Sequence, residues 1–147
     1  MADLSGFATK KEADEGVILP VKIKGKKLPI AIKLFGGDSD VVKEYERSKI
    51  RKLGFGKKGK TELDDDAIDE LLDSQDDAVL VRIGGVYSYD WEKEEIVKND
   101  PIELFGRVIE NDKASYKFLI ENIPAIKDWV TENSNDRDNF LSKGKKN

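Results

Sequence analysis

Two alternating apolar runs near the start of the chain predict a β-hairpin. Because side chains alternate between the two faces of a strand, each run would bury one face. The glycine-containing stretch Lys24–Lys27 provides the turn between them. Pro20 and Pro29 fall on the outward faces, and since proline cannot donate a ladder hydrogen bond, they predict exposed strand edges. A lone hairpin is marginal in water, so we expect it to pack on helices or on another subunit. The alternating residues are Val17, Leu19, Val21 and Ile23, then Leu28, Ile30, Ile32 and Leu34.

The middle of the chain is predicted to be helical. Gly36-Gly37 ends the hairpin, and Asp38 or Ser39 can cap a helix that runs to about Leu53. A second helix is expected from about Asp64, with a bend near Ser74-Gln75 and a stop at Gly84-Gly85. Its apolar face consists of Ile68, Leu71, Leu72, Val79, Leu80 and Ile83. The alternation of Tyr87, Tyr89 and Trp91 fits either an extended segment or a further helix.

The last third of the chain also has helical spacing. Asp100-Pro101-Ile102-Glu103 offers a cap, a proline at the first helical position and a glutamate at the third. Pro124 separates the next two apolar faces, and Ser134 can cap a final turn that reaches Phe140-Leu141. The three apolar faces are Ile102, Phe105, Val108 and Ile109; then Tyr116, Leu119, Ile120 and Ile123; then Ile126, Trp129 and Val130.

These elements predict an α+β fold in which an N-terminal β-hairpin packs on a mainly helical domain with a helical C-terminal third. At 147 residues the chain has the length of one domain, which we assign to residues 16–142. Residues 1–15 are polar and aperiodic and predict a flexible N-terminal arm, and residues 143–147 form a basic tail.

The composition argues against most catalytic chemistry. The chain has neither cysteine nor histidine, so it lacks a thiol nucleophile, a disulfide, and the commonest general base and metal ligand. We therefore expect no enzyme, and we assign no catalytic residue, cofactor or metal ligand. The first residues carry no secretory signal, and no apolar stretch approaches the roughly 20 residues of a membrane span. These features predict a cytoplasmic protein that binds no membrane.

Charge is unevenly distributed along the chain. Residues 47–60 contain seven basic and no acidic side chains, whereas residues 62–77 contain nine acidic and no basic ones. Adjacent blocks of opposite sign are typical of solvated faces, of a loop that folds back on its neighbour, or of a loop that docks a charged partner. The net charge is only −4, so nucleic acid is not an expected partner.

Gly54–Thr61 matches the phosphate-binding pattern G-x-x-x-x-G-K-T. That pattern works after a buried strand and before a helix, but here a charged helix is predicted before it and an acidic run follows it. The interpretation as a basic loop is therefore favoured over a nucleotide-binding enzyme. The acidic cluster Asp64-Asp65-Asp66, with Asp69 and Asp73, lacks the ligand spacing of a calcium loop and suits the positive end of a helix dipole.

The C-terminal sequence resembles a known closing signature. Phe118–Val130 reads FLIENIPAIKDWV, and Asn135–Leu141 reads NDRDNFL. Together they resemble the end of the tail assembly chaperones of long-tailed bacteriophages. Upstream, a short hairpin followed by a helix start at Gly37-Asp38-Ser39-Asp40 is similar to the same family. The resemblance covers about residues 17–141, and only its final third is specific.

The resemblance implies a non-enzymatic chaperone in the host cytoplasm. Such a protein binds the long, helical tape-measure protein and helps the tail-tube protein polymerise around it; a homo-oligomer is possible. A reversible cover for apolar stripes needs a small, partly apolar surface. The alternative function is a structural tail or connector protein of the phage virion. The candidate partner-binding residues are Ile126, Trp129, Val130, Arg137, Phe140 and Leu141, of which the five apolar ones fit a core role equally well.

Overall fold

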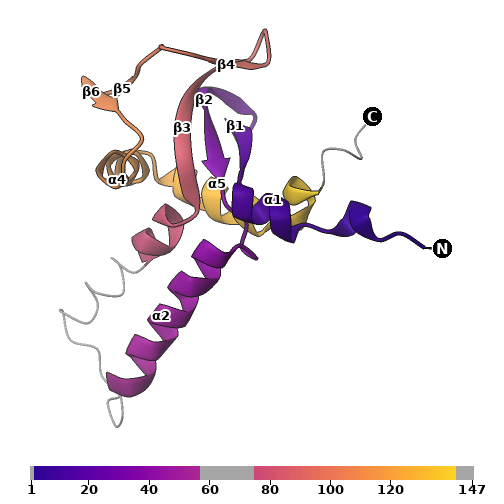
Figure 1. The fold of residues 1–147 in the computed structure, drawn as a ribbon. Helices are drawn as coiled ribbons and strands as arrows, with labels where there is room; N and C mark the ends of the chain where they lie inside the picture. Colours follow the sequence, from indigo (N-terminus) through magenta and orange to yellow (C-terminus); the bar gives the residue numbers. More distant parts are fainter. Residues whose placement is uncertain (1, 57–74, 142–147) are drawn as a thin grey trace.

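The computed structural model of the chain describes the backbone of residues 2–56 and 75–141, and the side chains of residues 2–51 and 75–141. The described part contains a four-stranded antiparallel sheet, in the order β1-β2-β3-β4, and a separate two-stranded sheet, β5-β6 (Figure 1). The strands are β1 (Val17–Ile23), β2 (Lys26–Leu34), β3 (Ile83–Asp90), β4 (Glu95–Val97), β5 (Ile102–Leu104) and β6 (Arg107–Ile109).

Helices precede, interrupt and follow the strands along the chain. Residues 75–80 form a further helical stretch that leads into β3. The fold is α+β and its C-terminal third is helical, as predicted. The named helices are α1 (Lys10–Glu15), α2 (Asp40–Gly56), α4 (Lys113–Asn122) and α5 (Pro124–Asn135), with short 3-10 turns η1 (Ser5–Phe7) and η2 (Arg137–Phe140).

The predicted N-terminal hairpin is confirmed, but only one of its strands is an edge. β1 and β2 pair from Val17↔Leu34 to Ile23↔Lys26, around a turn with positive φ at both of its residues. β3 pairs with the other side of β2, so the prediction of an exposed edge there is wrong. Pro29 lies one residue before the first β2–β3 pair, Ile30↔Ser88, and therefore interrupts no hydrogen bond of that ladder.

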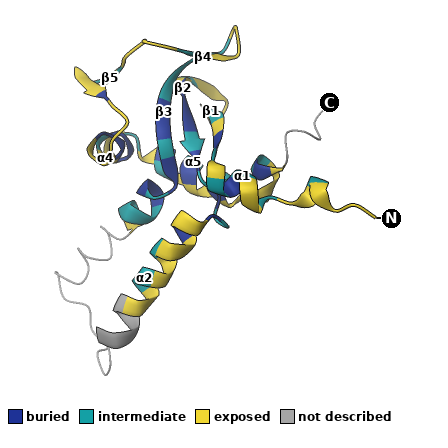
Figure 2. Cartoon of the chain, viewed as in Figure 1, coloured by how far each residue is buried: buried dark blue, intermediate teal, exposed yellow. Residues whose placement is uncertain are grey.

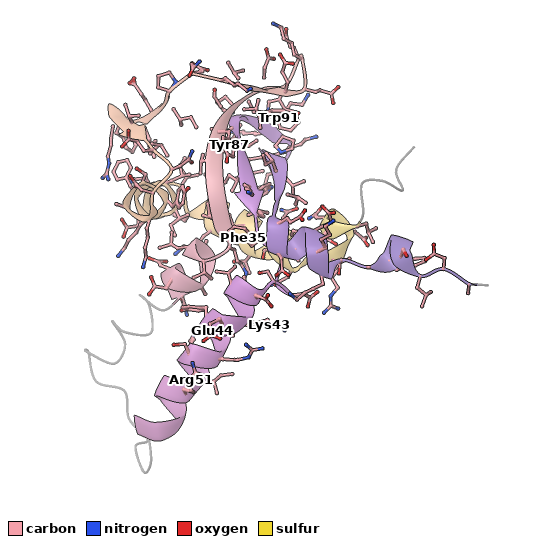
Figure 3. All side chains as sticks on the ribbon, viewed as in Figure 1. Phe35, Lys43, Glu44, Arg51, Tyr87 and Trp91 are labelled. Carbon is pink, nitrogen blue, oxygen red and sulfur yellow. The ribbon has the colours of Figure 1, made fainter. Side chains whose placement is uncertain are left out.

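The prediction that Gly84-Gly85 ends a helix is also wrong. The helical stretch ends at residue 80, and both glycines lie inside β3. This strand also contains Tyr87 and Tyr89, two of the three alternating aromatics that the sequence left undecided, whereas Trp91 lies in the turn that follows. A Cβ atom on Gly84 would lie 3.0 Å from the Phe35 ring, and one on Gly85 would lie 2.4 Å from the Tyr87 hydroxyl. The side chains of Phe35 and Tyr87, both labelled in Figure 3, thus occupy the space beside Gly84 and Gly85.

Residues 100–109 form a turn and a β-hairpin instead of the predicted helix. β5 and β6 pair from Ile102↔Ile109 to Leu104↔Arg107 around Phe105 and Gly106, which both have positive φ. The carboxylate of Asp100, the expected helix cap, instead accepts a hydrogen bond from the Ser88 hydroxyl at 2.7 Å. Phe105 is 82% exposed at the tip of this hairpin.

Part of the predicted N-terminal arm is a helix that packs on the body. Ala13 of α1 is buried, and its carbonyl oxygen accepts a hydrogen bond from the backbone N–H of Gly36 at 3.0 Å. The prediction of an aperiodic arm is therefore wrong for residues 10–15. An alanine at this position allows the close approach that a larger side chain would prevent.

The hydrophobic core lies between one face of the large sheet and the C-terminal helices (Figure 2). The predicted apolar faces of the hairpin and of α4 and α5 supply most of it, which confirms these three elements. Residues 57–74 and 142–147, including Lys57–Thr61 of the phosphate-binding pattern, the acidic cluster and the basic tail, lie outside the described residues. The buried core comprises Ala13, Val17, Val21, Ile30, Ile32, Leu34, Val79, Leu80, Ile83, Val86, Tyr116, Leu119, Ile120, Ile126, Val130 and Phe140.

Replacing Phe105 with asparagine is expected to stabilise the protein by about 1 kcal/mol, because asparagine adopts positive φ readily at the first position of such a turn. Urea unfolding of Phe105→Asn and Phe105→Ala measures this effect. Alanine lacks the short polar side chain whose local hydrogen bonds make positive φ accessible to asparagine, so its gain should be much smaller. Equal stabilities for the two variants would contradict the assigned turn geometry.

Candidate functional site

Two stretches that contribute to the family resemblance, around Gly37–Asp40 and Asn135–Leu141, meet in the structure. One is the loop of residues 35–39 between β2 and α2, and the other is the end of α5 together with η2. The guanidinium of Arg137 donates two hydrogen bonds to the carboxylate of Asp38, from Nε to Oδ2 at 2.6 Å and from Nη2 to Oδ1 at 3.0 Å. This parallel, two-point geometry is the strongest form of a side-chain ion pair. We call residues 35–39 and 134–140, with Ala13 of α1, the signature junction.

Backbone contacts reinforce the junction. The N–H of Gly37 donates to the carbonyl oxygen of Ser134 at 2.9 Å, and the Ser134 hydroxyl donates to the carbonyl oxygen of Phe35 at 2.8 Å. Ser134 is buried, and these two bonds give partners to its hydroxyl and its carbonyl oxygen, as buried polar groups require. The sequence predicted this serine as a cap of the last turn, but Asp136 has that role, because its Oδ1 accepts from the N–H of Asp138 at 3.0 Å.

Glycine is required at one position of the loop. A Cβ atom on Gly36 would lie 2.6 Å from the Cβ of Ala13 and 3.3 Å from the Phe140 ring. A Cβ atom on Gly37 would lie 2.5 Å from Oδ1 of Asn135, a side-chain tip that can move aside. The loop backbone at Gly36 therefore lies directly against α1 and η2, and a larger residue there would push these elements apart.

Ion pairs surround the junction on its exposed side. Lys10 of α1 bridges the carboxylates of Asp14 at 2.6 Å and Asp40 at 2.9 Å, which ties α1 to the start of α2. Hydrogen bonds from the Arg137 side chain lower the pKa of Asp38. A hollow of about 300 Å³ opens between these elements, with Thr9, Lys43, Glu46 and Asn135 among its lining residues. The arrangement joins charged groups in pairs and fixes the base of α2.

The structure divides the predicted partner-binding residues into two groups. Ile126, Val130 and Phe140 are buried in the core, so they do not form an accessible surface; for these three residues the core role holds. Trp129 is partly buried against the same core. Arg137 has a side chain that is 74% exposed, and Leu141 is 37% exposed. The six residues therefore form no single surface.

Sequence reasoning did not identify the partner of Arg137. Asp38 was considered only as a helix cap, and Ser39 takes that position, with its hydroxyl oxygen accepting from the N–H of Val42 at 3.4 Å. The contribution of α1 was also missed. One signal was present in the sequence, because the two segments that belong to the resemblance carry opposite charges at Asp38 and Arg137.

Most residues of the other sequence motifs, Lys57–Thr61 and the acidic cluster, lie outside the described residues. Gly54, Phe55 and Gly56 of the phosphate-binding pattern lie in α2, so the prediction that the basic loop begins at Gly54 is wrong for these three residues. The helix predicted before the pattern is confirmed. Across the described residues, no three acidic side chains gather as metal ligands would. Among those same residues no helix combines the length and apolarity of a membrane span. Comparisons with protein-family models, with curated proteins and with solved structures found no match.

A double-mutant cycle with Asp38→Asn and Arg137→Gln should give a coupling energy of about 1 kcal/mol at neutral pH, since the pair is two-pronged but its arginine is exposed. Because folding lowers the pKa of Asp38, this contribution is complete above the ordinary aspartate pKa of about 3.9 and is lost as the pH falls through the lowered value. Chemical denaturation at several pH values measures it.

The matched control is the exposed pair of Glu44 and Arg47, which are joined by a single contact of 3.5 Å within α2. Its coupling should stay near 0.3 kcal/mol, on the order expected for neighbours on a helix surface. A coupling at Asp38 and Arg137 no larger than this control would mean that the pair does not hold the junction.

Shortening single side chains to alanine at the end of η2 tests which residues belong to the core and which to the surface. Phe140→Ala should lower the free energy of unfolding by about 3–5 kcal/mol, because this ring is 1% exposed. Leu141→Ala, one residue further, should cost less than about 1 kcal/mol. Thermal unfolding of both variants measures the difference, and similar costs would show that Phe140 is not part of the core.

Proposed function

We propose that this protein is a tail assembly chaperone of a long-tailed bacteriophage, which binds the tape-measure protein and assists tail-tube polymerisation in the host cytoplasm. The observation that carries the proposal is the signature junction. Two of the stretches that contribute to the resemblance, Gly37–Asp40 and Asn135–Leu141, contact each other through Asp38 and Arg137, which lie 99 positions apart. A chance likeness in two separate stretches gives no reason for them to meet.

The junction also gives the resemblance a physical meaning. Its glycines, its buried serine and its ion pair hold α1, α2 and α5 in a fixed arrangement. The signature is therefore best understood as a scaffold, and binding falls to other parts of the surface. A chaperone of this kind needs no catalytic group, only surfaces that contact apolar helices reversibly.

Exposed apolar side chains are available for that purpose on three protruding parts of the molecule. They lie on the N-terminal turn, on α2 and on the β5–β6 hairpin, away from the core (Figure 2). Single exposed apolar residues are common on protein surfaces. Their concentration on projections supports contact with a large partner. These residues are Leu4 and Phe7 on the N-terminal turn, Val41 and Ile50 on α2, and Phe105 and Val108 on the hairpin.

Co-expression with the tape-measure protein from the same genome tests the proposal. The chain should raise the soluble fraction of the tape-measure protein and co-purify with it, because covered apolar stripes no longer aggregate. A Gly36→Val variant, which forces the junction apart, should lose both effects. Gly25→Asn is the matched control, since its Cβ atom would meet nothing within 4 Å and asparagine tolerates the positive φ of this turn.

Mass spectrometry of purified particles distinguishes the two phage functions. A chaperone should be absent from the particles, whereas a structural tail or connector protein should be present in stoichiometric amount. An insoluble tape-measure protein that never co-purifies with the wild-type chain would contradict the chaperone function directly.

A further inference from the structure

The four-stranded sheet has two faces, of which the C-terminal helices cover one. Residues paired across neighbouring strands share a face, and the pair Ile32 and Val86 packs with α4 and α5 in the hydrophobic core. The next row along the strands, Pro20, Ala31 and Tyr87, therefore points to the opposite side. We call that side the outer face. It consists of Ile18, Pro20, Ala31, Lys33, Gly85, Tyr87, Tyr89 and Ile96.

The outer face is apolar along most of its extent. An antiparallel sheet that has water on one side usually carries polar side chains there. Here the only charged residue is Lys33, whose ammonium lies 5.9 Å from the centre of the Phe35 ring. Ile18 is 38% exposed, and Ala31 is buried although the core cluster draws no member from the outer face. The face is thus an apolar surface outside the core.

Two groups of opposite charge flank the outer face at one end of the sheet. The β1–β2 turn and the β3–β4 turn lie at that end (Figure 1), and Lys27 of the first turn lies 5.3 Å from the centre of the Trp91 ring in the second. We call the charged groups of the two turns the basic corner and the acidic corner. The basic corner consists of Lys22, Lys24, Lys26 and Lys27, and the acidic corner of Glu92, Glu94 and Glu95 around Lys93.

The charges of both corners are available to a partner. All of these side chains are exposed, and within the described residues none of them takes part in an ion pair. The strand order β1-β2-β3-β4 puts the basic corner on one side of the sheet and the acidic corner on the other. A second copy of the same chain offers both signs in the same arrangement.

We infer that the outer face binds the outer face of a second copy of this chain, with a two-fold axis that runs parallel to the strands between the two sheets. Such an axis reverses the strand order, so β1 of one copy lies opposite β4 of the other, and both turn ends stay at the same end of the pair. The basic corner of each copy then lies opposite the acidic corner of its partner. The two apolar faces stack between these corners, about 10 Å apart.

The size of the face predicts a weak, reversible dimer. Four strands about 5 Å apart and roughly five residues long cover about 300 Å². Stable interfaces bury about 800 Å² per partner, so the pair should form only at high protein concentration. Pairing through the free edge of β1 is less suitable, because Pro20 lies in that strand and has no N–H to donate. This inference goes beyond the proposed function and does not rest on it.

Exchanging the charges of the two corners tests the arrangement. Sedimentation equilibrium of the full chain should show a mass that rises with concentration toward twice that of one chain. Lys22→Glu with Lys24→Glu should weaken the dimer by about tenfold or more at low salt, and so should Glu92→Lys with Glu94→Lys, because like charges then face each other. A chain that carries all four substitutions should recover to within about threefold of wild type, since opposite charges meet again.

A single substitution tests the face itself. Ile18→Lys should weaken the dimer by about tenfold or more even at high salt, because it brings a charge into the apolar contact. Ile18→Val keeps the surface apolar and should change the dimer by less than about threefold. The matched control for charge is Lys11→Glu with Lys117→Glu, at exposed positions outside the sheet, which should stay within about twofold of wild type. Circular dichroism of each variant checks that the fold is kept.

Every other outcome overturns the inference and leaves the proposed function standing. A wild-type chain that stays monomeric at all concentrations has no such dimer. A dimer that ignores Ile18→Lys uses another surface, and a four-fold variant that fails to recover excludes the two-fold arrangement. If the wild-type chain is monomeric and Ile18→Lys abolishes co-purification with the tape-measure protein, the face binds that protein instead of a second copy.

Discussion

The close approach of the chain to itself at Gly36 and Gly37 is the constraint on which the rest of the architecture depends. Here the backbone leaves β2 and contacts α1, the end of α5 and η2 before it enters α2. At Gly36 no side chain fits between the loop and α1, and the buried Ser134 and the Phe140 ring close the junction from the C-terminal side. The direction of α2 follows from this junction, since Val42 is the only one of its described side chains that the body buries.

This arrangement separates the tasks of the molecule. The sheet and the C-terminal helices supply the core, and the signature junction joins that core to the projecting helix. The charged groups near the junction are paired with one another. In the proposed chaperone, residues of the family signature therefore preserve the shape, and residues outside it contact the partner. Such a division explains how a scaffold can be retained while the binding surface changes.

The sequence predicted those elements whose apolar period and punctuation agree. The alternation of Val17–Ile23 and Leu28–Leu34 around a glycine turn gave the first hairpin correctly, and Pro124 separated α4 from α5. Two of the wrong predictions had a local signal that distant contacts overrode. Gly84-Gly85 looked like a helix stop because the covering ring of Phe35 is remote in sequence. Asp100 looked like a helix cap, but Ser88 of β3 engages its carboxylate.

The candidate binding residues show the same limit. Ile126, Trp129 and Val130 are similar in hydrophobicity and lie within one helix, so composition cannot tell which of them face the sheet. Burial depends on the orientation of α5, which is set by contacts of Ser134 with residues 99 positions away. The role of Asp38 in an ion pair was missed for the same reason, because its partner Arg137 is remote in the sequence.

Hydrogen exchange along α2 tests most directly the claim that this helix is held at its base by the signature junction. Amides of the distal half, around Arg47 to Arg51, should exchange far faster than those of β2 in the free protein, because local opening there breaks few packing contacts. Protection of these amides equal to that of β2 would contradict the account.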